Sequence, residues 1–94
     1  YMNDDMYVCP GWDEALVKHI GQMPSDLFML SGTMVEPVDT GNRCVVVHDA
    51  GRDAAHFRPD ELIAAVPRLK RADWLGATWP PTLVHRDWWN RVGG

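Results

Sequence analysis

The sequence predicts an α/β fold in which a layered sheet is flanked by helices. Short apolar or β-branched runs alternate with amphipathic segments of helical spacing, and Gly and Pro separate them. The expected order is strand, helix, strand, strand, helix, strand, helix, an alternation that favours a layered sheet. An apolar share of 46% is ordinary for a globular chain, and 94 residues allow one small domain or a piece of a larger one.

The first predicted elements are a strand and a helix. Residues 6–8 are expected to form the end of a strand that begins upstream. Segment 11–23 follows with apolar residues at helical spacing, and Asp13 and Glu14 lie near its start, where the helix dipole favours acids. Gly21 is the expected end of this helix.

The remaining elements follow from composition and from the placement of Pro and Gly. Pro59 stands at a typical first helical position, and Pro67 leaves the last turns of that helix open. Gly93 is a potential C-terminal cap for the final short helix. The predicted segments are a strand at 26–37, a turn at 38–43, a strand at 44–49, a loop at 50–57, a helix at 60–71, short extended pieces within 74–86 and a short helix at 86–94.

Charge, cysteine content and hydropathy exclude several classes of function for this stretch. The net charge is −4 with no basic block, which argues against a nucleic-acid surface. Cys9 and Cys44 lie far apart without CxxC spacing, so a reduced pair is expected, with one disulfide as the alternative. No apolar run of spanning length and no signal-like start occurs, so we expect no membrane span here.

The stretch "NDDM" places polar residues between apolar ones. At the end of an extended strand, the Asn3 and Asp5 side chains would point to the same side. Two such oxygen ligands can share Mg²⁺ or Mn²⁺, whose open positions substrate phosphates can fill. Ligands of α/β sheets bind beyond the carboxyl ends of strands, where this cluster is expected. The alternative is an Asx-type turn without a ligand.

The stretch "HRDWW" carries the second candidate site. His85 and Arg86 follow an extended apolar segment, and a His can ligate a metal while an Arg can bind a phosphate through two hydrogen bonds. Trp88 and Trp89 can line a cleft. The alternative is a short amphipathic helix whose Trp residues belong to the core.

Other motifs predict structural roles. The pair His48-Asp49 is expected to be a turn, and His19 and His56 are expected at the surface. The sequence contains no Walker loop and no GxSxG frame.

Four stretches, taken in order, resemble family 2 glycosyltransferases, which have the GT-A fold and use nucleotide-sugar donors. They are "YMNDDMYVCPGWDEALVKHI", "DLFMLSGTMVEP", "HFRPDELIAAVPRL" and "LVHRDWWNRVGG". The resemblance covers most of the chain and is weakest over residues 37–58. It implies that residues 1–94 are one partial catalytic domain with a partial GT-A-type, Rossmann-like sheet. The nucleotide-binding half would precede Tyr1, and the catalytic base would follow Gly94.

The resemblance also implies roles for single residues. Asp5 matches the acid that usually binds the metal, and Asn3 matches the first position of the motif, where Asp is commoner. Asp4 would contact the ribose or sugar of the donor. His85 and Arg86 match a pair near the diphosphate.

The expected partners follow from the same family. Trp88 and Trp89 would border the acceptor, which is a saccharide, a lipid or another hydroxyl compound. The reaction would be an inverting sugar transfer in which Mn²⁺ or Mg²⁺ stabilises the departing diphosphate. A base outside this chain would deprotonate the acceptor hydroxyl. The implied location is cytoplasmic, with the membrane face as an option.

Two other functional classes stay open at this point. One is a nucleotidyltransferase or metal-dependent phosphohydrolase that uses the same Asp cluster. The other is a non-catalytic interaction module in which the five Trp residues form a contact patch.

Overall fold

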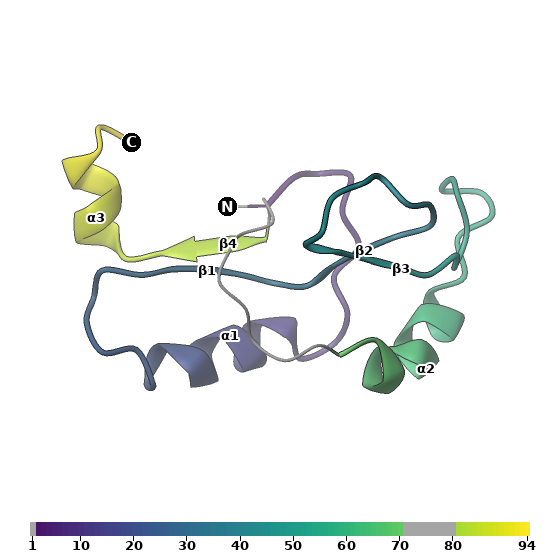
Figure 1. Cartoon of the computed structure of the whole chain (residues 1–94), viewed down its shortest axis with the longest axis horizontal. Coiled ribbons are helices and arrows are strands. Elements are labelled where there is room, and N and C mark those ends of the chain that lie inside the picture. Colours follow the sequence, from purple (N-terminus) through teal and green to yellow (C-terminus); the bar gives the residue numbers. More distant parts are fainter. Residues whose placement is uncertain (1, 71–80) are drawn as a thin grey trace. The chain divides into compact units, whose positions relative to one another are not determined.

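The computed structural model describes residues 2–70 and 81–94 (Figure 1). The chain divides into two compact units. The terminal unit contains both chain ends, Tyr1–Gly32 and Trp79–Gly94, and the central unit is Thr33–Thr78. Each unit combines helix with a two-stranded sheet, so the mixed α/β character predicted from the sequence is confirmed.

The terminal unit is built on an antiparallel strand pair. Its described elements are α1 (Trp12–Ile20), β1 (Met29–Ser31), β4 (Thr82–Val84) and α3 (Arg86–Arg91). In the register of β1 and β4, Leu30 lies opposite Leu83. The Gly32 N–H donates to the Pro81 carbonyl over 3.0 Å, which extends the pairing by one hydrogen bond.

A tight turn sets the start of α1. In "CPGW", Pro10 and Gly11 occupy the two central positions of a type II turn, where Pro fixes φ and Gly supplies a positive φ, here 76°. The Trp12 N–H closes the turn on the Cys9 carbonyl at 3.3 Å, and the Ala15 N–H then bonds the Gly11 carbonyl at 3.1 Å. The helix ends at Ile20, and Gly21 is its C-cap residue, so the predicted end is confirmed.

The end of α3 is a Schellman motif. Gly93 has φ 86°, and its N–H donates to the Asn90 carbonyl over 3.4 Å. The Gly94 N–H reaches back to the Trp89 carbonyl over 3.1 Å. These two bonds are the pair that defines the motif, so the predicted Gly93 cap is confirmed.

The central unit contains a parallel strand pair and the longest described helix. Its elements are β2 (Met34–Glu36), β3 (Val45–Val47) and α2 (Pro59–Leu69). β2 and β3 pair in register, with Val35 opposite Val46, and the His48 N–H adds a bond to the Glu36 carbonyl at 2.9 Å. The buried Val, Leu and Ala side chains of the described residues lie here: Val45, Val46, Ala50, Leu62 and Ala65.

Side-chain hydrogen bonds shape the short connection between β2 and β3. Asp39 Oδ1 accepts from the Gly41 N–H at 2.8 Å, and Asn42 Oδ1 accepts from the Cys44 N–H at 2.9 Å. Gly41 has φ 74°. Asp, Asn and Gly at these positions are the residues that turns favour, and the turn predicted at 38–43 is confirmed.

Two strand predictions are wrong in this structure. Residues 2–10 contain no strand, so the strand end expected at 6–8 is absent. The run 26–37 is not one strand but two, β1 and β2, which belong to different sheets and to different units. Gly32 lies at the division, and a Cβ there would stand 3.1 Å from the Pro81 Cγ. The absence of a side chain therefore admits the close approach of Pro81.

The other local predictions that the structure describes are confirmed. They include all three helices, with Pro59 at the first position of α2 and Pro67 inside it, and strand β3. The extended piece expected before residue 81 lies outside the described residues. No described helix combines the length and the hydropathy that a membrane crossing needs.

Candidate functional site

The acidic stretch near the N-terminus is an exposed turn. Asn3, Asp4 and Asp5 are all exposed, and Asp4 and Asp5 form the turn itself. The strand-end geometry that would project Asn3 and Asp5 to one side is therefore absent. The local structure instead follows the preference of consecutive Asn and Asp residues for turns.

The oxygens of Asn3, Asp4 and Asp5 are nevertheless suitable ligand atoms for a hard cation. Carboxylate and amide oxygens are the ligands that Mg²⁺ and Mn²⁺ prefer. The ion pairs between described residues leave Asp4 and Asp5 out. Over residues 2–70 and 81–94, no three His, Cys, Asp or Glu side chains gather as a metal site.

His85 caps helix α3. Its backbone is extended, and its Nδ1 accepts a hydrogen bond from the Asp87 N–H over 3.3 Å. The ring meets Phe28 edge-on, with centroids 6.3 Å apart. Because Nδ1 is an acceptor in this bond, the neutral ring carries its hydrogen on Nε2. The side chain is about one-third exposed, so Nε2 is the atom with which His85 can act on a ligand.

The residues after His85 differ in their availability. Arg86, the first residue of α3, is exposed. Trp88 is half-buried, and the Arg91 guanidinium carbon lies 5.4 Å from its ring centroid. Trp89 is 49% exposed. The expected short helix is confirmed, and the exposure of Trp89 argues against a core position for that residue.

The two predicted sites share one unit but are not joined. The β4–α3 junction, in the C-terminal segment of the unit, contains His85, Arg86, Trp88 and Trp89. The acidic turn belongs to the N-terminal segment of the same unit. Among the described residues, no hydrogen bond or ion pair connects the turn of residues 3–5 with this junction.

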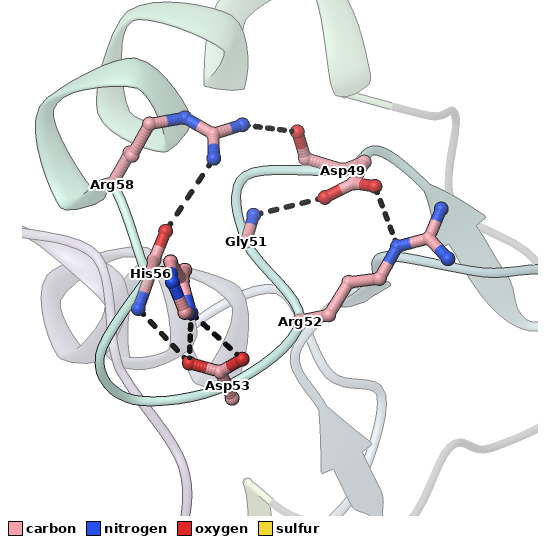
Figure 2. A network of polar contacts seen from close by, with 6 residues as sticks. All are labelled: Asp49, Gly51, Arg52, Asp53, His56 and Arg58. Atoms are coloured by element: carbon pink, nitrogen blue, oxygen red, sulfur yellow. Dashed lines mark hydrogen bonds and ion pairs between the residues drawn. The ribbon is translucent and has the colours of Figure 1, made fainter.

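The sequence reasoning missed a polar network between β3 and α2 (Figure 2). Asp49 lies at its start: Oδ1 accepts from the Gly51 N–H at 3.0 Å, and Oδ2 accepts from Arg52 Nε at 2.8 Å. The hydrogen bond from Arg52, followed by that from Gly51, lowers the pKa of Asp49 below its usual value. Asp49 therefore forms the turn that the sequence predicts for His48-Asp49.

Arg58 closes the same loop at its far end. Its guanidinium donates to the Asp49 carbonyl at 3.0 Å and to the His56 carbonyl at 3.4 Å, and its Nε pairs with Glu61. This pair raises the pKa of Arg58 and lowers the pKa of Glu61. The spacing R-x-x-E at the start of a helix was the available signal for it.

The four His residues have different surroundings. His56 is exposed, as predicted, and its Nδ1 lies 2.7 Å from Asp53 Oδ1. His19 is half-buried and keeps part of its side chain at the surface. The Nε2 atom of His48 is buried, with no hydrogen-bond partner among the described residues. Both cysteines are free, and burial raises the pKa of the Cys9 thiol.

Comparisons of the chain with models of protein families, with curated proteins and with solved structures give no match.

Proposed function

We propose that this chain is part of a metal-dependent glycosyltransferase that moves a sugar from a nucleotide-sugar donor to an acceptor hydroxyl. The observation that carries the proposal is the order of four stretches, at 1–20, 26–37, 56–69 and 83–94, which together resemble family 2 glycosyltransferases. Two of these stretches contain the acidic turn and the β4–α3 junction, and both lie in the terminal unit.

The acidic turn is the proposed cation site. Asp5, together with Asn3, would hold Mn²⁺ or Mg²⁺, and Asp4 would contact the ribose or sugar of the donor. The bound cation would supply positive charge beside the departing diphosphate. The exposure of all three side chains leaves their oxygens accessible to a cation and a donor from solvent.

The β4–α3 junction is the proposed diphosphate contact. The Arg86 guanidinium is exposed and can bind two phosphate oxygens at once. His85 would donate from Nε2, because its Nδ1 accepts the capping hydrogen bond from Asp87. His85 therefore orients the donor and does not serve as a metal ligand through Nδ1.

The resemblance implies that the nucleotide-binding half lies outside residues 1–94, so this chain would supply only the cation and diphosphate contacts. The test is therefore binding of UDP-glucose, UDP-N-acetylglucosamine and GDP-mannose at millimolar concentration to the 94-residue chain by calorimetry, with and without Mn²⁺. We expect Mn²⁺-dependent binding of at least one donor, weakened by more than about tenfold in Asp5→Ala, since even outer-shell changes cost that much at metal sites. Asp13→Ala, another acid of this unit, is the matched control. Equal affinity of wild type and Asp5→Ala would contradict the proposal. Preference for nucleoside triphosphates would favour a nucleotidyltransferase instead.

Arg86→Lys tests the diphosphate contact. An ammonium group cannot form the bidentate contact of a guanidinium, so donor affinity should fall by several-fold. Arg91→Lys changes an Arg that lies over Trp88 and should leave donor affinity unchanged. If the two variants bind equally well, Arg86 has no special role.

A further inference from the structure

His85 and His56 both use the Nδ1 atom in a local contact, but the partners are opposite in kind. The Nδ1 of His85 accepts from the Asp87 backbone N–H over 3.3 Å, and this hydrogen bond caps α3. The Nδ1 of His56 lies 2.7 Å from the Asp53 carboxylate, which can only accept (Figure 2). The two rings therefore differ in what happens to their hydrogen bonds when they gain a proton.

A proton on Nδ1 of His85 removes the cap of α3. The imidazolium ion carries an N–H at both ring nitrogens and has no acceptor left. The Asp87 N–H would then face another donor. It belongs to the first turn of the helix, where backbone N–H groups have no partner within the helix and depend on a cap.

The charges around His85 give its protonated ring a different partner. Asp87 Oδ2 lies 4.0 Å from Nδ1, and this carboxylate is the ion-pair partner of the ring among the described residues. The Asp87 side chain is 83% exposed, so solvent screens the attraction. Arg86, the next residue, is a cation and opposes a second positive charge. Phe28, in the segment before β1, meets the ring edge-on and carries no charge.

We propose that His85 is a pH-sensitive cap: the neutral ring closes the first turn of α3, and protonation opens this turn by moving Nδ1 from the Asp87 N–H to the Asp87 carboxylate. Histidine is the side chain that ordinarily changes charge between about pH 5 and 8. The stabilisation of the turn is present while the ring is neutral and is lost as the pH falls. Because α3 holds no fully buried residue, packing does not replace the lost cap. The inference is independent of the proposed function.

His56 provides a contrast within the same chain. Its Nδ1–H donates to Asp53, and its backbone N–H also donates to Asp53 Oδ1 at 3.0 Å. Protonation of this ring leaves both bonds in place and adds a charge opposite to that of the carboxylate. The opening caused by mild acid is therefore confined to α3 and leaves the loop before α2 closed.

The experiment is an NMR titration of the 94-residue chain from about pH 8 to about pH 5, the range in which histidine changes charge. Imidazole ¹⁵N shifts report the proton on Nδ1 of His85, and Cα shifts of Asp87 and Trp88 report the first turn. We expect both to change with one midpoint. The ratio of closed to open turn should fall by about two- to fivefold, the value of one capping bond. The Cα shifts of α2 are the internal reference and should stay constant.

Two Asn variants separate the cap from other effects of acid. His85→Asn retains an acceptor that does not titrate, so its α3 shifts should be independent of pH over this range. His56→Asn removes the other imidazole and should leave the pH dependence of α3 as in wild type. A proton on Nδ1 of the neutral His85 ring, pH-independent α3 shifts in wild type, an unchanged pH dependence in His85→Asn, or loss of the α2 shifts at the same midpoint would each overturn the inference.

Discussion

The two units differ in how they use their side chains. Among the described residues, the central unit contains all the buried Val, Leu and Ala side chains, and its polar loop at 48–58 is closed by hydrogen bonds between its own residues. The terminal unit contains every residue predicted for the site, and its helices α1 and α3 bury none of their residues fully.

The comparison of two acidic stretches makes the difference concrete. Asp49 has two partners within 3.0 Å, and its turn is complete without a ligand. Asp5 is exposed and outside the ion pairs of the described residues. An acid whose oxygens already accept hydrogen bonds from its own loop stabilises that loop, whereas an acid left to solvent retains its capacity for an external cation.

The largest expected effect separates these two acids directly. Asp5→Asn should weaken Mn²⁺ binding by more than about tenfold in the presence of a nucleotide sugar, because an amide is a poorer ligand for a hard cation. Asp49→Asn should leave Mn²⁺ binding unchanged and lower the thermal midpoint of the chain. Electron paramagnetic resonance of free Mn²⁺ measures the first effect and circular dichroism the second. If Asp49→Asn reduces Mn²⁺ binding, the two acids do not differ as proposed.

A second prediction compares two glycines of the central unit. Gly51→Ala places a Cβ on the His56 carbonyl and forces a residue with φ 117° to carry a side chain. Gly41→Ala, at φ 74°, has a smaller conformational penalty, about 1 kcal/mol, and its Cβ meets open space. We expect Gly51→Ala to lower the free energy of unfolding by about 2 kcal/mol more than Gly41→Ala, within the range for strained loop residues. Urea unfolding followed by circular dichroism measures both, and equal losses would contradict the packing of this loop.

A third prediction concerns the cap of α3. His85→Ala removes the acceptor of the Asp87 N–H, so the first turn of α3 should fray, at a cost of about 0.5–1 kcal/mol. His85→Asn keeps a capping oxygen and should preserve the turn. Backbone chemical shifts of Asp87 and Trp88 report the fraying. Helical shifts in His85→Ala equal to those of wild type would show that the cap contributes nothing.

The smallest expected effect is the titration of Asp49. Its pKa is lowered in the folded chain, so its contribution to stability is present above the pKa of the unfolded chain and is lost as the pH falls through the lower, folded value. In Arg52→Ala the largest cause of the shift is removed, and the pKa of Asp49 should rise toward its ordinary value. Carboxyl ¹³C titration measures it, with Arg68→Ala as the control. An unchanged midpoint in Arg52→Ala would contradict the pairing.

The sequence predicted the start of α2 and the end of α3 correctly, because these depend on residues next to them in the chain. Pro59 starts α2, and Gly93 ends α3, because the backbone needs of those positions are met by few residue types. The division of segment 26–37 into two strands at Gly32 could not be predicted from the sequence. It depends on Pro81 and β4, which are distant in sequence.

The candidate site was predictable to a similar extent. The sequence identified the residues of the β4–α3 junction and their helix, but not that His85 caps it through Nδ1. At residues 3–5 the apolar flanks favoured a strand end, whereas the consecutive Asn and Asp residues favoured a turn. The structure has the turn, because this segment pairs with no described strand. The packing of Gly94 on Trp89 was missed because a terminal Gly-Gly carries no periodic pattern.

The concentration of buried aliphatic side chains in the central unit has a consequence for hydrogen exchange. Backbone amides of β3 and α2 that are hydrogen-bonded lie in segments with buried Val46, Leu62 and Ala65, so their exchange with solvent deuterium should require unpacking of these side chains. Amides of α1 and α3 need no such event, because their helices hold no fully buried residue. Exchange should therefore occur in two populations, a slow one in the central unit and a fast one in the terminal unit. Ligand binding at the terminal unit would be visible as protection gained where the unliganded chain exchanges fastest.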